Sequence, residues 1–149
     1  MTIKIISHKD CLKHINPPGH PEQVARLEYI LDALAPLGLD IVDAPLVADD
    51  DLLRVHSQSH IRAIQAAVPV SGWTSLDNDT HVCPDTLTAA LRAAGGAVQA
   101  VDMVMDDEVQ SVFVATRPPG HNCERETPMG FCFFGNVAKA AKHALDHHG

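Results

Sequence analysis

A chain of 149 residues is long enough for one ordinary domain and too short for two independent cores. Apolar residues make up 46% and charged residues 20%, which excludes a disordered or fibrous chain. The net charge of −8 argues against a nucleic-acid partner. No apolar run approaches the ~20 residues of a membrane span, and the N-terminus lacks a signal-peptide pattern, so no membrane partner is expected. The four scattered cysteines favour a reduced, cytoplasmic location.

The first half of the chain alternates strand-like and helical patterns. Strands are predicted over residues 3–7 and 39–42. Between them, Pro21 is well placed to begin a helix that Pro36 and Gly38 end. Two further helical segments are predicted, one opening at residues 49–51 and one with an inner face over residues 61–68. Residues 69–83 show no period and are interpreted as a loop.

The second half contains the longest predicted helix and the clearest strand. Residues 84–105 carry an apolar stripe at helical spacing. Gly95 and Gly96 inside this helix predict close backbone packing, against the sheet. Residues 110–116 are apolar enough to form a central strand. Strands that alternate with helices favour an α/β fold with a parallel sheet.

The final helix is predicted to begin at Asn136, whose side chain would cap it. Its inward face is predicted to be apolar and to consist of Val137, Ala140, Ala141 and Leu145. His143 and His147 have the spacing of two metal ligands on a helix. A closed zinc site needs four converging ligands, so this pair is interpreted as a solvated polar face, with fortuitous metal binding as the alternative. The cysteines are interpreted as buried small residues.

The segment after residues 110–116 lies where open α/β sheets bind ligands. Two prolines and a glycine fix a turn that presents His121, and Gly130 with Phe131 offers an aromatic wall. A histidine on such a rigid loop suits a general acid/base or a charge stabiliser. The alternative is a stiff loop whose histidine only hydrogen-bonds a backbone carbonyl.

Two longer motifs lie in this segment, Arg117-Pro-Pro-Gly-His121 and Met129-Gly-Phe-Cys-Phe-Phe-Gly-Asn-Val-Ala138. They resemble the R-P-P-G-H-H and G-F-C-x-F-N-N-V-A motifs of the histone deacetylase and acetylpolyamine amidohydrolase family. Shorter matches, among them His20-Pro-Glu22, extend the resemblance over the whole sequence. The resemblance implies an arginase/deacetylase-like three-layer α/β/α fold with a partial parallel sheet. It also implies one domain over residues 1–149, truncated after the helix that follows the R-P-P-G-H motif.

In that family the reaction is zinc-dependent hydrolysis of acetyl-lysine or acetylpolyamine amides. The resemblance makes His121 the first of two catalytic histidines, a charge-stabilising partner. Asn122 stands where the family has the second histidine, which accepts the proton of the attacking water. A carboxamide cannot accept a proton near neutral pH, so we expect a large loss of rate.

The resemblance also assigns substrate-binding residues. Gly130 and Phe131 match the wall of the acyl-lysine channel. Asp79, with Asp77 as the less favoured alternative, falls near the aspartate that grips the substrate backbone. His20 matches the loop beside the pocket.

The family's zinc motif, D-x-D-x-H-H-G-N-G, lies beyond the helix that ends this sequence. No metal ligand and no cofactor are therefore expected in this chain, although the complete family uses zinc. The tail Leu145-Asp-His-His-Gly149 is only superficially similar, because Asp146 and His147 are neighbours and lack the Asp-x-His spacing.

Three interpretations follow. The chain is the N-terminal part of a deacetylase, inactive in isolation. Alternatively, it is a free-standing, non-catalytic binding or assembly module. In the third interpretation it is half of a split deacetylase, completed by a C-terminal half on a separate chain. A truncated sheet exposes its last strand, so we expect a homodimer or larger homo-oligomer.

Overall fold

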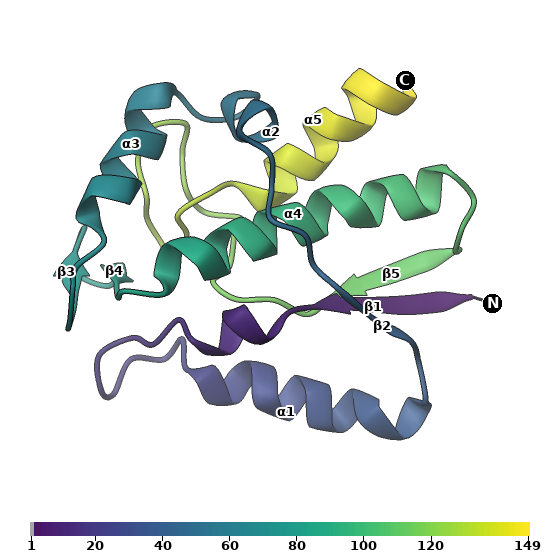
Figure 1. Cartoon of the computed structure of the whole chain (residues 1–149), viewed down its shortest axis with the longest axis horizontal. Coiled ribbons are helices and arrows are strands. Elements are labelled where there is room, and N and C mark those ends of the chain that lie inside the picture. Colours follow the sequence, from purple (N-terminus) through teal and green to yellow (C-terminus); the bar gives the residue numbers. More distant parts are fainter. Residues whose placement is uncertain (1) are drawn as a thin grey trace.

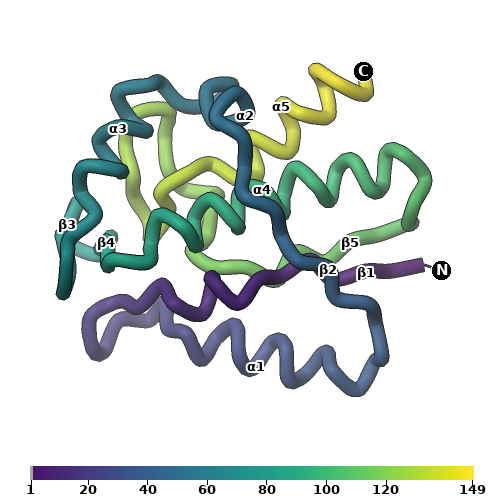
Figure 2. The backbone as a smooth tube through the Cα atoms, in the orientation of Figure 1, coloured from purple at the N-terminus to yellow at the C-terminus, as the bar shows by residue number. Residues whose placement is uncertain are grey.

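The structure is a computed structural model that describes residues 2–149 (Figures 1 and 2). The regular elements, in chain order, are β1 (Ile3–Ser7), η1 (Lys9–Leu12), α1 (Val24–Leu34), η2 (Ala35–Leu37), β2 (Ile41–Asp43), α2 (Asp49–Leu53), α3 (Gln58–Ala67), β3 (Thr74–Ser75), β4 (His81–Val82), α4 (Thr86–Met105), β5 (Ser111–Val114) and α5 (Asn136–His148). None of the helices within residues 2–149 combines the length and apolar composition needed to cross a bilayer.

Three parallel strands form the main sheet, in the order β2-β1-β5. Helix α1 covers one face, and α4 with α5 packed on it lies on the other (Figure 1). Successive residues of β1 serve the two faces in turn, because side chains alternate along a strand. Ile5 packs with Leu27 of α1, and Ile6 packs with Met103 of α4. These three layers confirm the expected α/β/α fold.

The position of β5 corrects one prediction. Within the described residues β5 pairs with β1 alone, so β1 is the central strand and β5 lies at an edge. The apolar character of β5 comes from its faces: Val112 and Val114 pack toward α4. An apolar strand sequence does not show whether both edges of the strand are hydrogen-bonded, so it does not separate a central strand from an edge strand. The exposed fraction of Phe113, 48%, is consistent with this edge position.

The glycine pair in α4 packs closely, as predicted. A Cβ on Gly96 would lie 3.1 Å from Cγ2 of Ile6, a side chain of the sheet. A Cβ on Gly95 would overlap the carbonyl of Pro45, in the segment that follows β2. Larger residues at these two positions would therefore push α4 away from the sheet.

Three predicted boundaries differ from the structure. Helix α1 begins at Val24 rather than at Pro21, because the Glu22 N–H donates to Nδ1 of His20 (3.0 Å) and holds these residues in a turn. The second strand is Ile41–Asp43 instead of residues 39–42. The segment interpreted as a loop contains the short antiparallel pair β3–β4.

Helix α5 is rotated about its axis relative to the prediction. Val137 and Leu145, expected to face inward, have exposed fractions of 64% and 69%. Lys139 and His143 are buried instead. Nε2 of His143 lies 2.6 Å from Oδ1 of Asp102. The polar side of the helix therefore faces the protein, which a hydrophobic pattern cannot predict. The interpretation of His143 as part of a solvated face is wrong.

The buried Lys139 predicts an unusual pH dependence of stability. Its ammonium has no hydrogen-bond partner, and burial lowers the pKa of Lys139 from 10.5 to about 8. Between these values the unfolded chain binds more protons, so stability rises with pH by up to about 3 kcal/mol. We expect Lys139→Met to raise the free energy of unfolding near pH 7 by about 1–3 kcal/mol and to remove this rise.

Urea unfolding from about pH 7 to about pH 10 measures both effects. Lys142→Met, on the exposed side of the same helix, is the matched control and should keep the wild-type slope. If the free energy of unfolding rose equally steeply with pH in the wild type and in Lys139→Met, the prediction would be contradicted.

Candidate active site

The loop after β5 is anchored at Arg117 by a buried ion pair. The Arg117 guanidinium donates from Nε to both carboxylate oxygens of Glu22, at 3.0 and 2.9 Å. Its Nη1 donates to the carbonyls of Cys11 (3.0 Å) and His14 (2.7 Å). Charge-assisted hydrogen bonds of this kind are stronger than hydrogen bonds between neutral groups. They join the start of the candidate loop to the 20–22 loop, although these segments are distant in sequence.

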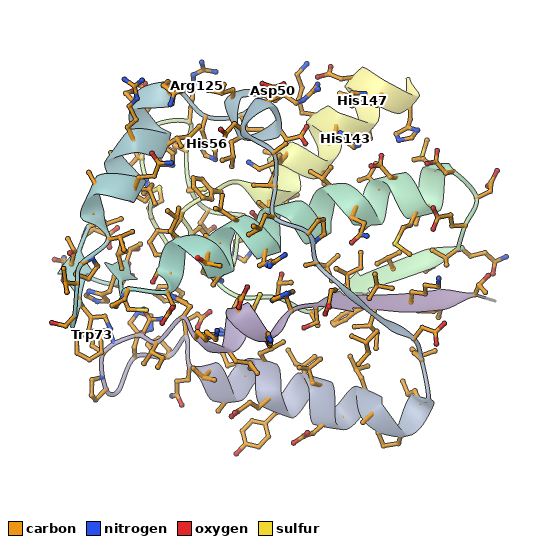
Figure 3. All side chains as sticks on the ribbon, viewed as in Figure 1. Asp50, His56, Trp73, Arg125, His143 and His147 are labelled. Atoms are coloured by element: carbon orange, nitrogen blue, oxygen red, sulfur yellow. The ribbon has the colours of Figure 1, made fainter. Side chains whose placement is uncertain are left out.

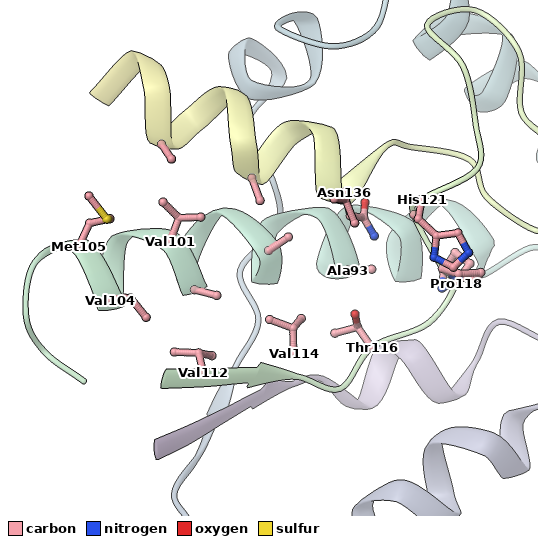
Figure 4. A pocket seen from close by; sticks show the side chains of 17 residues that line it. Ala93, Val101, Val104, Met105, Val112, Val114, Thr116, Pro118, His121 and Asn136 are labelled. Carbon is pink, nitrogen blue, oxygen red and sulfur yellow. The ribbon is translucent and has the colours of Figure 1, made fainter. Parts of the chain in front are cut away.

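The turn that presents His121 rests on the first residue of α5. A Cβ on Gly120 would overlap the Asn136 amide, so only glycine fits there. The Gly120 carbonyl accepts the Val137 N–H at 3.1 Å. Asn136 does not cap α5 as predicted, because it is already the first helical residue and Gly135 occupies the N-cap. The His121 side chain is exposed (Figure 4).

Gly130 and Phe131 form a tight turn beside this loop. Both have positive φ, +58° and +68°, which is strained for phenylalanine. Mutual hydrogen bonds between Met129 and Cys132, at 3.1 and 3.0 Å, hold the turn. The Phe131 N–H also donates to Oγ1 of Thr80 at 3.2 Å. The backbone that carries the Phe131 ring is thus held both by its own turn and by Thr80 of a distant segment.

His20 lies against the Phe131 ring, with ring centroids 4.7 Å apart in an edge arrangement. Because Nδ1 of His20 accepts the Glu22 N–H, its Nε2 carries the proton and donates to the Asp79 carbonyl at 2.7 Å. The structure therefore brings His20, Phe131 and Asp79 together, and their substrate-binding roles stay predictions.

The two candidate aspartates differ in their surroundings. The Asp77 carboxylate accepts the N–H groups of Asp79 (3.0 Å) and Thr80 (2.7 Å) and so shapes the turn. Burial works to raise the pKa of Asp77, but these hydrogen bonds outweigh it and hold the pKa below its usual range. The Asp79 residue is exposed, and its carboxylate accepts only the Thr80 hydroxyl, at 3.2 Å. Of the two carboxylates, that of Asp79 is therefore the one available to accept hydrogen bonds from a ligand.

Asn122 and His121 contact the turn formed by Gly130 and Phe131, Asn122 directly and His121 through Cys132. A Cβ on Gly130 would lie 2.7 Å from Cβ of Asn122, so the asparagine side chain lies directly on the glycine. Cys132 sits between the loops: its Sγ accepts the His121 N–H at 3.4 Å and donates to the Gly130 carbonyl at 3.2 Å. This positioning by Cys132 was not predicted. Its burial was, and Cys11 and Cys83 are also buried free thiols.

An apolar groove of about 610 Å³ opens beside His121 (Figure 4). Its walls come from β5, α4 and α5, and the α5 wall includes Val137 and Ala140 of the face that was predicted to point inward. The larger apolar residues among those that line it are Val101, Val104, Met105, Val112, Val114 and Val137. The sequence did not predict this groove, because the apolar residues that line it have the spacing of ordinary core residues.

Potential metal donors gather in two groups of three within residues 2–149, and neither group includes His121. One group is Asp51, His143 and His147, and the other is Asp102, His143 and His148. Figure 3 shows His143 and His147 on α5, beside α2. Both groups lie toward the C-terminal end of α5, whereas the Gly120–His121 turn rests on its first residue.

Comparison with known proteins agrees with this geometry. The Histone deacetylase domain family matches residues 20–149. A probable deacetylase of Archaeoglobus fulgidus is 33% identical over 97% of this chain and 42% of its own length. A histone deacetylase-like amidohydrolase of Pseudomonas aeruginosa is 37% identical over 91% of this chain and 37% of its own. The crystal structure of the HDA15 HD domain superposes with a TM-score of 0.91 at 26% identity, over 97% of this chain and 44% of that one.

The chain therefore belongs to the histone deacetylase family. It spans about two fifths of the length of these two curated relatives.

Proposed function

We propose that this chain forms the substrate-channel side of a deacetylase-type amide hydrolase site and is inactive in isolation. The observation that carries the proposal is the contact network from His121 through Cys132 to Gly130 and Phe131. It holds a histidine and an aromatic wall in fixed relation, which is what positioning an acyl group beside a proton-handling side chain requires.

In this proposal each residue has a distinct role. Phe131 and Gly130 line the passage for an acetylated amine, with His20 supporting the ring. The exposed Asp79 carboxylate accepts hydrogen bonds from the substrate backbone. His121 stabilises charge at the reacting amide, while Asn122 orients a water without taking its proton. Acetyl-lysine or acetylpolyamine amides are the proposed substrate class, and a relative of 35% identity is named polyamine deacetylase HDAC10 of Mus musculus.

Zinc would supply a polarised carbonyl and an activated water in such a site. The described residues around His121 do not fit it, since neither group of three His, Cys, Asp or Glu side chains includes His121. We therefore derive no step through a metal in this chain. Ligands for a metal would come from a segment outside residues 1–149 or from a second polypeptide, as in the split-enzyme interpretation.

Hydrolysis assays test this proposal. The chain, supplied with zinc, should release no acetate from an acetyl-lysine peptide or an acetylated polyamine above the level of His121→Ala. Asn122→His should also stay at that level, because restoring the second histidine does not restore a metal. Zinc-dependent turnover by the wild type that His121→Ala loses would contradict the proposal.

The exposed edge of β5 supports a second candidate function, that of an assembly module. In the described residues β5 has one paired edge, and the apolar groove lies directly beside it. An unpaired edge with apolar surroundings favours pairing with another strand. We propose a second copy of this chain as the occupant, with the two β5 strands pairing across a two-fold axis.

Light scattering after gel filtration tests this assembly. We expect the wild type to be a dimer or larger at micromolar concentration. Phe113→Lys, which places a charge at the β5 edge, should shift it to monomer. Tyr29→Lys is the matched control, because Tyr29 is an exposed aromatic residue on α1. A wild type that stays monomeric at all concentrations would rule the assembly out.

A further inference from the structure

Three ligand-type side chains meet where α2 and α5 adjoin. Asp51 of α2 and His143 and His147 of α5 each offer one atom, and these atoms lie within 4.8 Å of one another. Oδ1 of Asp51 is 3.9 Å from Nδ1 of His143. The two imidazole rings, one helical turn apart, have centroids separated by 4.4 Å. Two imidazoles and a carboxylate thus converge on one small volume.

The buried His143 is the member that points to a ligand. Its exposed fraction is 7%, and its Nε2 lies 2.6 Å from Oδ1 of Asp102. A proton on Nε2 makes this a donated hydrogen bond and leaves a lone pair on Nδ1. That Nδ1 is buried and has no hydrogen-bond partner. A buried nitrogen lone pair that faces a carboxylate is unfavourable unless a cation or a proton lies between them.

We propose that Asp51, His143 and His147 bind a zinc-type divalent ion. Nδ1 of His143, the imidazole of His147 and the Asp51 carboxylate are the ligands, and one position stays open to water. Asp102 orients His143 through its other nitrogen, the arrangement by which outer carboxylates fix ligating histidines. Two nitrogen donors favour zinc over magnesium or calcium, which prefer all-oxygen sites.

Arg54 holds the ligands in the metal-free state. Its Nε donates to Oδ1 of Asp51 at 3.1 Å, and its Nη2 to Nε2 of His147 at 2.8 Å. A third bond joins Nη1 to Asp146 at 2.6 Å. The metal replaces the guanidinium at two of these groups, and Arg54 retains Asp146. Arg54→Gln should therefore bind zinc more tightly than the wild type, because it removes both the competitor and its charge.

The neighbouring group of Asp102, His143 and His148 is the weaker alternative. There, Nε2 of His143 and Nε2 of His148 already lie 2.6 and 2.9 Å from the same Asp102 oxygen. The three atoms that would bind a metal there, Nε2 of each histidine and Oδ1 of Asp102, therefore already have hydrogen-bond partners. A metal would have to displace two satisfied hydrogen bonds, whereas at Asp51 it meets an unpartnered nitrogen.

Adjacent alanine substitutions distinguish the two arrangements. Calorimetric titration of the full chain with zinc should show one ion per chain. His147→Ala should weaken binding by about 100-fold, and Asp102→Asn by about 10–100-fold. His148→Ala, the matched control, should stay within about threefold of the wild type. Circular dichroism confirms that each variant is folded.

Cobalt provides an independent readout, since the intensity of its visible absorption reports the coordination number. We expect the wild type and His148→Ala to share one cobalt spectrum that His147→Ala lacks. No zinc uptake by the wild type, equal affinity in all variants, similar weakening by both histidine substitutions, or a loss specific to His148→Ala would each overturn the proposal.

Discussion

Glu22→Ala is expected to lower the free energy of unfolding by about 3–5 kcal/mol, because it leaves the Arg117 charge buried without its partner. Both side chains are almost fully buried, with exposed fractions of 5% for Arg117 and 2% for Glu22. The Arg117 guanidinium would keep its bonds to the carbonyls of Cys11 and His14 but lose the carboxylate. The loop that presents His121 would lose its anchor to the 20–22 loop at the same time.

Urea unfolding near pH 7 measures this loss. Glu28→Ala, an exposed carboxylate on α1, is the control and should change the free energy of unfolding by less than about 0.5 kcal/mol. The double variant Glu22→Leu with Arg117→Met removes both charges and should lose less than the sum of the single variants. A change below about 1 kcal/mol for Glu22→Ala would show that water reaches the Arg117 charge.

Acid should destabilise the protein well before its carboxylates are protonated. Burial lowers the pKa of His14 from 6.5 to about 3, with the Arg117 and His20 charges adding to the effect. Burial also lowers the pKa of His56 from 6.5 to about 4. Below about pH 6.5 these two histidines are protonated in the unfolded chain but stay neutral in the folded chain. The free energy of unfolding therefore falls as the pH falls. For His14 alone the full effect is about 5 kcal/mol.

The urea midpoint from about pH 7 to about pH 4 measures this acid dependence. His14→Gln cannot titrate, so its midpoint should depend less steeply on pH whatever its stability at neutral pH. The exposed His121 is the matched control: His121→Gln should keep the wild-type dependence of the midpoint on pH. A slope unchanged by His14→Gln would mean that His14 becomes charged in the folded state near its usual pKa.

Local pattern was sufficient for much of the fold. The strand β1, the long helix α4 and the close packing of Gly95 and Gly96 follow from apolar spacing and from the absence of a side chain. The pattern was insufficient for β5, because apolar side chains do not show whether both edges of a strand are paired, and Phe113 is half exposed. It was also insufficient for α5, where Lys139 is buried against the Phe134 ring, His143 is buried beside Asp102, and Val137 faces outward.

The candidate site shows a similar division. The family resemblance assigned His20, Asp79 and Phe131 to the surroundings of one substrate channel, and the structure shows contacts among them, while their roles stay predictions. The roles of Thr80 and Cys132 depend on hydrogen bonds between distant loops, which no local pattern encodes. The ion pair that fixes the loop joins residues 22 and 117, so it too required the folded chain. The catalytic roles of His121 and Asn122 stay predictions.

Imidazole resonances recorded during a zinc titration test the central claim, that the His121 end of this chain offers a channel wall without a metal centre. Labelled histidines report each ring separately, and His121→Ala assigns the decisive signal. We predict that the His121 resonances stay in place at one zinc per chain, whether or not His143 and His147 shift. A zinc-dependent shift or exchange broadening of His121 at that ratio would contradict the claim and place a metal beside the candidate catalytic histidine.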